Sequence, residues 1–372
     1  MTTTLNPFSR PFYMMAKPVG ATCNLACRYC YYLDKRRLYA RTADVPHGAA
    51  MVMSDEVLEL FIRQYIESQT STEVLFTWHG GEPTLLPLSF YEKAQRLQQR
   101  YAAGRHIDNC LQTNGTLLND EWCRFFHDNG WLIGVSIDGP QWLHDSYRMT
   151  RSGEPSWQRV METVGRLERH DVMWNALCTV NSLNAEHPVE VYRFFRSMGC
   201  RYLQLTPVGG DVTAQQWGRF LCDVFDEWQK ADVGEVYINI FEATLANYMG
   251  VTPGICAMST LCGHVGVVEW NGDVYSCDHF VYSQHHLGNI CRHTIYELMH
   301  SPQQQAFASQ KTGGLPRQCR QCRWLFTCHG ECPRNRTATT ADGESGLNYL
   351  CEGYRAFFAH TETFMKAMKN EI

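Results

Sequence analysis

Hydrophobic and polar positions between residues 53 and 206 follow two alternating patterns. Apolar residues three and four positions apart predict helices, and short apolar runs that stop at turn residues predict strands. The predicted helices span residues 53–68, 88–101, 120–128, 155–170 and 187–198. The predicted strands span residues 73–78, 109–113, 131–137, 174–180 and 202–206, with one more expected just before Cys23. This alternation predicts an α/β fold of parallel strands and crossover helices. About six such repeats fit a partial barrel better than a closed eight-stranded one.

The pattern changes after this region. Residues 213–249 predict two helices with a break near Gly234, whereas residues 251–351 are rich in cysteine, glycine and turns and show little periodicity. Residues 353–369 have a helical pattern again. We therefore expect three parts: a partial barrel over residues 12–235, a cysteine-rich domain over residues 236–355 and a C-terminal helix over residues 356–372.

Several glycine-rich or polar motifs directly follow predicted strands. They are the segment from Cys23, Gly80-Gly81, Asn114-Gly115 and residues 136–139. Ligands of parallel α/β folds bind at the carboxyl ends of the strands. We therefore expect these motifs to contribute to one binding site.

The charge balance limits the classes of partner. The 372 residues carry a formal net charge of -5, with 44% hydrophobic and 19% charged residues, as in a soluble globular protein. A mildly acidic chain argues against nucleic acid or an anionic membrane as a partner. The first ten residues lack the pattern of a signal peptide, and no apolar run reaches the roughly 18 residues needed to span a bilayer. We expect a cytoplasmic protein.

Seventeen cysteines are too many for packing alone in a reducing compartment, where disulfides are disfavoured. Three lie at residues 23–30 and eight lie in the last third of the chain. The other six are predicted to be small buried hydrophobic residues: Cys110, Cys123, Cys178, Cys200, Cys222 and Cys291. The two groups therefore indicate metal or redox chemistry.

The N-terminal group, Cys23, Cys27 and Cys30, has the spacing C-x3-C-x2-C and is called the cysteine loop below. Three thiolates on one loop can hold three corners of a [4Fe–4S] cluster, which leaves the fourth iron without a protein ligand. The natural ligand for that open iron is S-adenosylmethionine (SAM). The cysteine loop therefore predicts a SAM-dependent redox enzyme.

The C-terminal group provides two complete sets of four thiolates. It comprises Cys256, Cys262, Cys277, Cys319, Cys322, Cys328, Cys332 and Cys351. A cluster with four cysteine ligands is closed, so it exchanges electrons without binding substrate at iron. Two structural zinc sites would use the same short C-x2-C spacings, and spacing alone does not separate these alternatives.

Several motifs in the same order resemble one family. The cysteine loop, with Tyr29 before its last cysteine, resembles the radical SAM motif, and residues 80–83 (Gly-Gly-Glu-Pro) are similar to the segment that contacts the SAM amino group. The C-terminal cysteine pattern resembles the SPASM domain. With Asp278 directly after Cys277, the chain is identified as a member of the anaerobic sulfatase-maturating enzymes. The resemblance implies a partial (β/α)6 TIM-like barrel of the radical SAM type, then a SPASM domain and a C-terminal helix.

The resemblance also implies the reaction. These enzymes oxidise a cysteine or serine in a sulfatase Cys/Ser-x-Pro-x-Arg motif to Cα-formylglycine, using a 5′-deoxyadenosyl radical that takes a hydrogen from Cβ. By resemblance, Asp278 is the base that takes the thiol or hydroxyl proton, and an auxiliary cluster accepts the second electron. A carboxylate largely out of water should have a raised pKa, which would make it a better base. Alternatively, Asp278 is an ordinary turn residue and not a base.

The resemblance assigns further residues to cofactors. The implied SAM contacts are Tyr29, Gly81, Ser136, Arg148 and Leu203. The implied ligands of the first auxiliary cluster, called auxiliary set 1, are Cys256, Cys262, Cys277 and Cys332. The implied ligands of the second, called auxiliary set 2, are Cys319, Cys322, Cys328 and Cys351. His79 is expected to be a hydrogen-bonding group at a strand end rather than a catalyst.

The implied partners are an unfolded or nascent sulfatase polypeptide and an electron donor such as flavodoxin or ferredoxin. A second hypothesis keeps the radical but forms thioether or carbon–carbon crosslinks in a ribosomal peptide. Such relatives often carry an N-terminal peptide-recognition domain, for which the roughly 20 residues before Cys23 leave no room. A third hypothesis is a non-catalytic electron carrier or zinc scaffold, against which the open cysteine loop argues.

Overall fold

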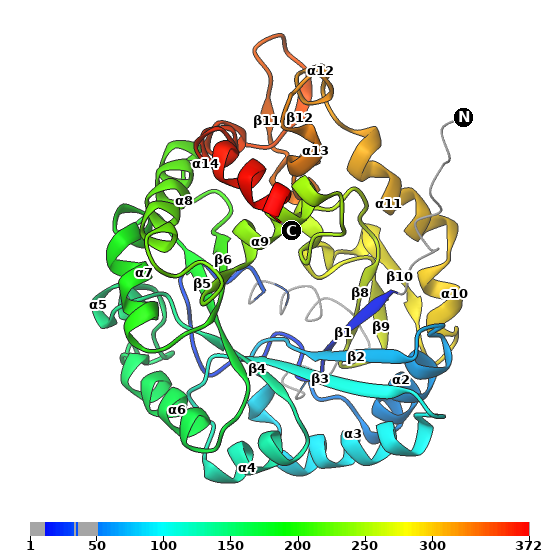
Figure 1. Ribbon diagram of the computed structural model, residues 1–372. Coiled ribbons are helices and arrows are strands. Elements are labelled where there is room, and N and C mark those ends of the chain that lie inside the picture. Colours follow the sequence, from blue (N-terminus) through cyan, green and yellow to red (C-terminus); the bar gives the residue numbers. More distant parts are fainter. Residues whose placement is uncertain (1–11, 33–34, 36–50, 372) are drawn as a thin grey trace. The chain divides into compact units, whose positions relative to one another are not determined.

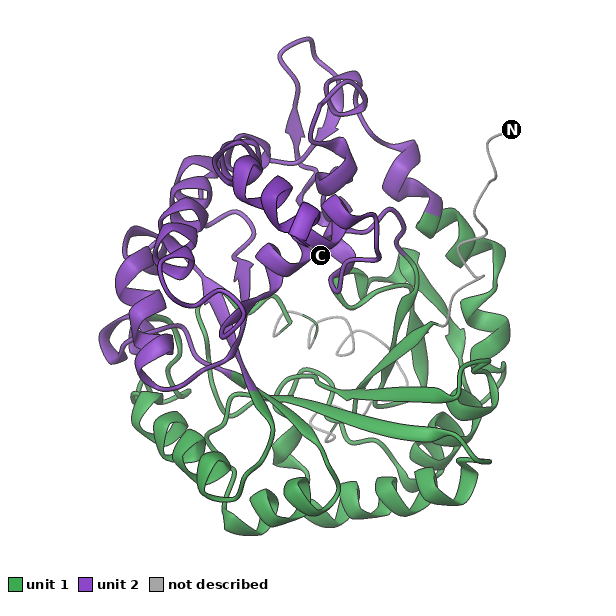
Figure 2. Ribbon diagram, in the orientation of Figure 1, with its two compact units in different colours: residues 1–135, 147–174, 263–308 green, residues 136–146, 175–262, 309–372 purple. Residues whose placement is uncertain are grey.

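The computed structural model describes residues 12–32, 35 and 51–371 and contains two compact units (Figures 1 and 2). Unit 1 comprises residues 1–135, 147–174 and 263–308, and unit 2 comprises residues 136–146, 175–262 and 309–372. The chain thus passes between the units several times. The predicted division of the sequence at residues 235 and 355 stays a prediction.

Unit 1 contains a sheet with the strand order β10-β9-β8-β1-β2-β3-β4. The pairs β1–β2, β2–β3, β3–β4 and β1–β8 are parallel, whereas β8–β9 and β9–β10 are antiparallel. The strands are β1 (Tyr13–Lys17), β2 (Glu73–Trp78), β3 (His106–Thr113), β4 (Leu132–Ser136), β8 (Val265–Glu269), β9 (Asp273–Tyr275) and β10 (His286–Asn289). Because β1 to β4 are parallel, the segments that follow them leave the sheet at the same edge.

Amphipathic helices alternate with these strands. In the first of them, Asp55–Glu67, the Ser54 side chain caps the N-terminus by accepting from the Val57 N–H, at 3.3 Å. Its buried face contributes Phe61 and Tyr65 to an aromatic core, and burying such a side chain stabilises the fold by about 1.5–3 kcal/mol. The helices are α2 (Asp55–Glu67), α3 (Leu88–Tyr101), α4 (Asp120–Asp128), α6 (Trp157–Arg169), α10 (Ile295–Met299) and α11 (Pro302–Gly313), the last of which crosses the unit boundary at residue 308.

Unit 2 contains the parallel strands β5 (Trp174–Val180), β6 (Tyr202–Pro207) and β7 (Tyr237–Ile238), in that order. Its long helices α8 (Ala214–Gln229) and α14 (Cys351–Glu371) pack closely. A Cβ at Gly353 would lie 2.2 Å from the Ala214 carbonyl oxygen, so this crossing requires glycine. The remaining elements are α5 (Gln141–Tyr147), α7 (Pro188–Ser197), α9 (Asn239–Met249), α12 (Arg317–Arg320), α13 (Leu325–Cys328), β11 (Ala338–Thr339) and β12 (Ser345–Leu347).

The fold class predicted from the sequence is confirmed: the molecule is an α/β protein with parallel strands and a C-terminal helix. All five predicted helices between residues 53 and 198 are present, and the predicted strands are β2 to β6. The sequence missed the elements α10 to α13, β11 and β12 in the cysteine-rich region, and α11 among them has twelve residues. It also missed α5, β7 and the three strands β8 to β10, all of which are seven residues or fewer. Such short elements hold too few residues for a periodic pattern, and pairing with a neighbouring strand stabilises them.

The scattered cysteines only partly follow the prediction. Cys123, Cys178 and Cys200 are buried, and Cys110 and Cys222 are half-buried. The prediction was wrong for Cys291, which is exposed because it follows β10 in a turn at the surface.

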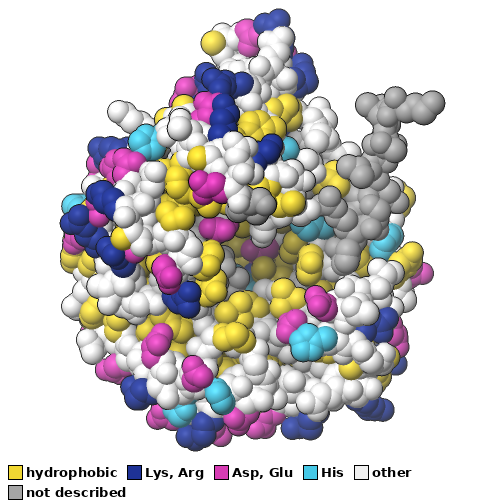
Figure 3. Space-filling model, in the orientation of Figure 1, with side chains coloured by type: hydrophobic (Ala, Val, Ile, Leu, Met, Phe, Trp, Pro, Cys, Tyr) yellow, Lys and Arg dark blue, Asp and Glu magenta, His cyan; other side chains and the backbone are white. Residues whose placement is uncertain are grey.

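Among the described residues, no helix is long and apolar enough to cross a membrane. On the face shown in Figure 3, acidic and basic side chains are interspersed, in keeping with the small net charge. The first eleven residues, which bear on the compartment prediction, lie outside the described part.

Candidate active site

The cysteine loop of unit 1 follows β1 and is held in place by backbone hydrogen bonds. The Ala26 N–H donates to the Met149 carbonyl at 2.8 Å, and the Arg28 N–H donates to the Tyr147 carbonyl at 3.0 Å. All three thiols of the loop are half-buried. One short segment therefore carries three candidate sulfur ligands, and backbone contacts fix its path.

Two N–H groups point at the first thiol of this loop. The Leu25 N–H donates to Cys23 Sγ at 3.4 Å, and Asn114 Nδ2 lies 3.7 Å from the same sulfur. Asn114 also donates to the Asn24 side-chain oxygen at 2.9 Å, which fixes its orientation. Burial raises the pKa of Cys23 to about 11, so iron must displace the thiol proton on binding. The donors suit a sulfur that carries negative charge as a ligand.

The glycine-rich motif after β2 packs directly on the residues before the cysteine loop. The Gly81 N–H donates to the Gly20 carbonyl and the Glu82 N–H to the Thr22 carbonyl, both at 2.8 Å. A Cβ at Gly81 would lie 1.9 Å from the Thr22 carbonyl oxygen, so no other residue fits. The buried Glu82 carboxylate accepts hydrogen bonds from Thr84, Thr113 and Asn114, which joins the ends of β2 and β3.

The predicted SAM contacts fall into two groups. Tyr29, Gly81 and Arg148 lie in unit 1 with the cysteine loop. The Arg148 guanidinium carbon lies 5.4 Å from the centre of the Tyr29 ring, within range of a cation–π contact, and its side chain is buried. Ser136 is the last residue of β4, and Leu203 is buried in β6; both are counted with unit 2.

Asp278 lies in unit 1 and forms a close ion pair with Lys17. Lys17 Nζ is 2.6 Å from Asp278 Oδ1, and the Tyr31 hydroxyl donates to Oδ2 at 2.6 Å. The Lys17 side chain is 0% exposed and the Asp278 side chain 15% exposed. Lys17 and Tyr31 thus fix the carboxylate, while a small part of the side chain stays exposed.

Lys17 also orients His79, because Nζ donates to His79 Nδ1 at 2.5 Å. Burial and the Lys17 charge lower the pKa of His79 to about 3, so the ring is neutral near pH 7. With Nδ1 accepting, its proton is on Nε2. The hydrogen bond fits the expectation that His79 is a hydrogen-bonding group at a strand end, and its exclusion from catalysis stays a prediction.

The expected pKa of Asp278 was wrong. Burial by itself raises the pKa of this carboxyl, as expected, but the adjacent Lys17 ammonium outweighs it and holds the pKa well below its usual range. Asp278 is therefore ionised at all physiological pH values. This pairing could not be read from the sequence, because 261 positions separate Lys17 from Asp278. The available signal was a lysine that ends an apolar strand before the cysteine loop.

A second buried carboxylate lies beside Lys17. Glu269 pairs with Lys17 in the β1–β8 register and accepts a short hydrogen bond from the Tyr32 hydroxyl. Lys17 Nζ also lies 4.5 Å from the centre of the Tyr32 ring. Burial raises the pKa of Glu269 to about 7. Glu269 and Tyr31 were not predicted from the sequence either, since each lies in an ordinary strand or loop context.

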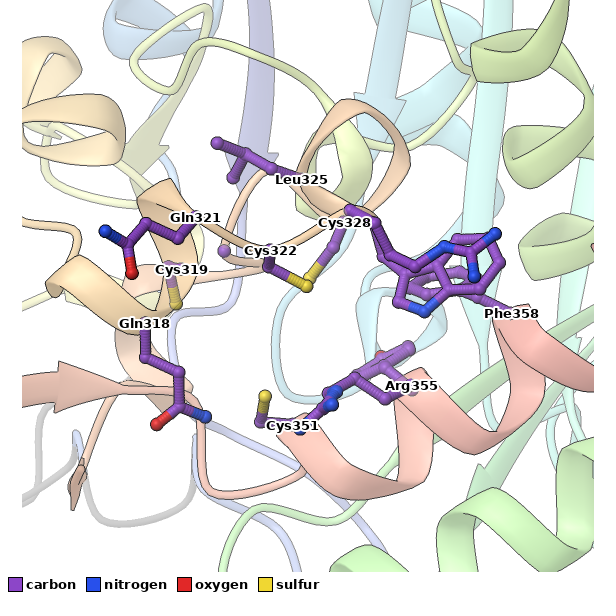
Figure 4. Close-up of a pocket in the computed structure, with 13 residues that line it drawn as sticks. Gln318, Cys319, Gln321, Cys322, Leu325, Cys328, Cys351, Arg355 and Phe358 are labelled. Carbon is purple, nitrogen blue, oxygen red and sulfur yellow. The ribbon is translucent and has the colours of Figure 1, made fainter. Parts of the chain in front are cut away.

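Auxiliary set 2 surrounds a cavity of about 390 Å³ within unit 2. The sulfur atoms of Cys319, Cys322, Cys328 and Cys351 point toward the same space in Figure 4, from α12, from the turn after it, from α13 and from the first turn of α14. Four thiols around one cavity fit a closed iron–sulfur cluster, whose ligands are all cysteine.

Auxiliary set 1 is divided between the units. Cys256, Cys262 and Cys332 belong to unit 2, and Cys277 belongs to unit 1 beside Asp278. Within unit 2, the buried Lys311 fixes the backbone at the first of these cysteines: its Nζ donates to the carbonyls of Cys256 and Ala257, at 3.1 and 2.7 Å. A buried cation beside a predicted thiolate ligand suits a negatively charged cluster.

Residues 18–195 match the Radical SAM superfamily, and residues 261–323 match SPASM, an iron–sulfur cluster-binding domain. Over 395 aligned positions, which cover 100% of this chain and 94% of the relative, the chain is 52% identical to the serine-type anaerobic sulfatase-maturating enzyme of Bacteroides thetaiotaomicron. The chain belongs to the anaerobic sulfatase-maturating enzymes. It is thus a radical SAM enzyme, as the sequence predicted.

Other members of this family are also similar to this chain. The cysteine-type anaerobic sulfatase-maturating enzyme of Clostridium perfringens is 31% identical over 97% of this chain and 99% of the relative. The solved structure of native anSMEcpe with bound AdoMet and Kp18Cys peptide is 30% identical, with a TM-score of 0.87 over 98% of this chain and 100% of that chain. The predicted cofactors, SAM with one SAM-binding and two auxiliary [4Fe–4S] clusters, are those of this family. Which residue serves which cofactor stays a prediction.

Proposed function

We propose that this enzyme oxidises a serine or cysteine in a Ser/Cys-x-Pro-x-Arg segment of a sulfatase polypeptide to Cα-formylglycine. The observation that carries the proposal is the Asp278 side chain, which is partly exposed, lies one residue after Cys277 and is fixed by Lys17 and Tyr31. The names of the relatives support the substrate class, and solved anSMEcpe structures hold Kp18Cys or Cp18Cys peptides. The 52% identity to a serine-type enzyme favours serine as an accepted residue.

Eleven cysteines hold the iron–sulfur clusters, and five further residues bind SAM. Cys23, Cys27 and Cys30 hold the open cluster, and auxiliary sets 1 and 2 hold the closed ones. When bound, SAM and its cluster supply a 5′-deoxyadenosyl radical that removes a Cβ hydrogen, and an auxiliary cluster accepts the second electron. Tyr29, Gly81, Ser136, Arg148 and Leu203 contact SAM.

The role of Asp278 follows from its ionised state. A carboxylate with such a low pKa is a weak base toward a resting thiol or hydroxyl. Removal of the Cβ hydrogen makes the adjacent S–H or O–H proton much more acidic, so a permanently ionised carboxylate suffices at that stage. The proton moves to Asp278, the electron leaves the substrate, and the carbon–oxygen or carbon–sulfur double bond forms. A thioaldehyde from cysteine then reacts with water, which gives the aldehyde and releases hydrogen sulfide.

Lys17 keeps this carboxylate in one orientation, and His79 keeps Lys17 in place. Because the neutral His79 ring accepts at Nδ1, its Nε2–H remains a donor for an acceptor such as a peptide carbonyl. An extended polypeptide is recognised largely through backbone hydrogen bonds. We propose an unfolded or nascent sulfatase as the partner in the cytoplasm, and flavodoxin or ferredoxin as the electron donor.

The proposal is tested with purified enzyme whose clusters have been reconstituted without oxygen. The enzyme is incubated with SAM, a reductant and synthetic peptides that contain Ser-x-Pro-x-Arg or Cys-x-Pro-x-Arg, and products are read by mass spectrometry with a hydrazine trap for aldehydes. We expect aldehyde from the serine peptide. SAM cleavage without aldehyde on either peptide, or a crosslinked product, would contradict the proposal and favour a crosslinking enzyme.

Replacing Arg148 with alanine should weaken SAM binding by roughly tenfold to a hundredfold, because a buried charged contact of about 1.5–3 kcal/mol is lost. Equilibrium binding of SAM to the reconstituted protein measures the change. Arg151→Ala is the matched control, since that side chain lies exposed three residues further on. Unchanged SAM affinity in the Arg148 variant would remove this residue from the binding site.

A further inference from the structure

The three residues between Cys328 and Cys332 form a left-handed turn. The φ angles of His329, Gly330 and Glu331 are +49°, +71° and +54°. Only glycine adopts this region without strain, so two of the three residues are strained. Three consecutive residues of this kind persist only where the surrounding structure holds them.

A single guanidinium holds this turn. Arg336 donates from Nη2 to the carbonyls of His329 and Glu331, at 3.1 and 3.2 Å, and from Nε to that of Gly330, at 2.9 Å. Its Nη1 donates to the Gln310 carbonyl at 3.3 Å, which ties the side chain to α11. All three carbonyls of the turn therefore accept from one rigid planar group, and lysine does not offer this geometry.

The Glu331 side chain fixes the other side of the turn. It is buried, and its Oε2 accepts from Asn335 Nδ2 at 3.0 Å and from Asn348 Nδ2 at 2.7 Å. The Asn348 carbonyl in turn accepts from the N–H of Cys351, at 3.0 Å. The turn is thereby connected to the start of α14, which carries another ligand of auxiliary set 2.

The two cysteines that flank the turn have different surroundings. Cys328 lines the cavity of auxiliary set 2, whereas Cys332 does not. We propose that Arg336 and Glu331 are positioning residues that hold the left-handed turn at 329–331, so that one short loop delivers Cys328 and Cys332 to two different iron–sulfur clusters. This inference rests on the proposed ligand assignment of auxiliary sets 1 and 2.

The positive charge of Arg336 adds a second effect. The guanidinium interacts electrostatically with Cys262 of auxiliary set 1 and with Cys319 and Cys328 of auxiliary set 2. Reduction makes a four-thiolate cluster more negative, so a nearby cation stabilises its reduced form. Removing the charge should shift the potential of any auxiliary cluster that still assembles to more negative values.

Two glycine variants test the turn. A Cβ at Gly330 would lie 2.2 Å from Leu315 Cδ2 and 2.7 Å from Arg336 Nη2, so Gly330→Ala should displace the guanidinium. Gly250→Ala is the matched control, because Gly250 has φ +73° with nothing within 4 Å of a Cβ. Full-length protein is reconstituted without oxygen, and iron and sulfide per chain are counted, against about twelve iron atoms for three clusters. We expect Gly330→Ala to lose at least about four iron atoms and Gly250→Ala to lose none.

Two arginine variants separate geometry from charge. Arg336→Gln should lose auxiliary iron and shift the midpoint potential of the remaining auxiliary cluster to more negative values. A redox titration monitored by electron paramagnetic resonance measures this potential. Arg336→Lys should also lose iron but keep the potential closer to that of the unmodified enzyme. Arg317→Gln, at an exposed ion pair with Asp342, should change neither. SAM binding by the cysteine loop serves as the measure of folding in every variant.

Cysteine variants separate this inference from the ligand assignment. Cys328→Ala and Cys332→Ala should each lose iron. If Cys332→Ala keeps full iron, the assignment fails. If both cysteine variants lose iron while Gly330→Ala and Arg336→Gln keep full iron with unchanged potentials, the assignment stands and the positioning role of Arg336 is overturned.

Discussion

Replacing Asp278 with asparagine should lower the rate of formylglycine formation by about 10²–10⁴-fold, the usual contribution of a general base, while SAM cleavage continues. Asparagine keeps the shape of the side chain but accepts no proton as a base. The Cβ hydrogen can still be removed, and the oxidation then stalls. Measuring 5′-deoxyadenosine and aldehyde in the same reaction separates the two steps.

The control for this variant is Asp273→Asn. Asp273 is a nearby half-buried carboxylate of unit 1 whose partners, His286 and Asn289, lie in β10. The Asp273→Asn variant should form 5′-deoxyadenosine and aldehyde in yields close to those of the unmodified enzyme. Full aldehyde yield from Asp278→Asn would exclude this carboxylate as the proton acceptor.

Replacing Lys17 with methionine should destabilise the protein by about 3–5 kcal/mol, because breaking a buried ion pair leaves an uncompensated charge. Lys17 is fully buried and faces Asp278, Glu269 and His79. Denaturant unfolding measures the change in the free energy of unfolding. Lys93→Met, at an exposed pair with Asp55, should cost at most about 1 kcal/mol.

A double variant shows whether the cost comes from the pair itself. Lys17→Met with Asp278→Asn removes both charges, so part of the lost stability should return, with a coupling energy of about 0.5–3 kcal/mol. Strictly additive losses would show that Lys17 stabilises the fold through other contacts. Formylglycine formation should stay low in the double variant, since the base is absent.

Much of the framework could be predicted from the sequence because long elements carry strong patterns. The strands β2 and β5 have the predicted bounds, since apolar runs there end at clear turn residues. The cysteine loop and the Gly80-Gly81 motif could be placed at strand ends for the same reason. Spacing and residue type predict sulfur ligands, because the candidate ligands of one loop are close in the sequence.

The electrostatics of the site could not be predicted in this way. The pKa of Asp278 depends on Lys17, which reaches it only because β1 and β8 are neighbours in the sheet, and β8 is one of the short strands that pattern analysis missed. Burial alone predicts the opposite direction of the shift. The left-handed turn held by Arg336 could not be predicted either. Histidine and glutamate rarely adopt positive φ, as His329 and Glu331 do here.

The most direct test of the account uses a Ser-x-Pro-x-Arg peptide with deuterium at Cβ of the serine. The unmodified, reconstituted enzyme is incubated with this peptide, SAM and a reductant without oxygen, and 5′-deoxyadenosine and peptide are both analysed by mass spectrometry. The account predicts deuterium in 5′-deoxyadenosine together with a matching amount of aldehyde that has lost one Cβ deuterium. The absence of aldehyde, or 5′-deoxyadenosine that carries no deuterium, would contradict the account.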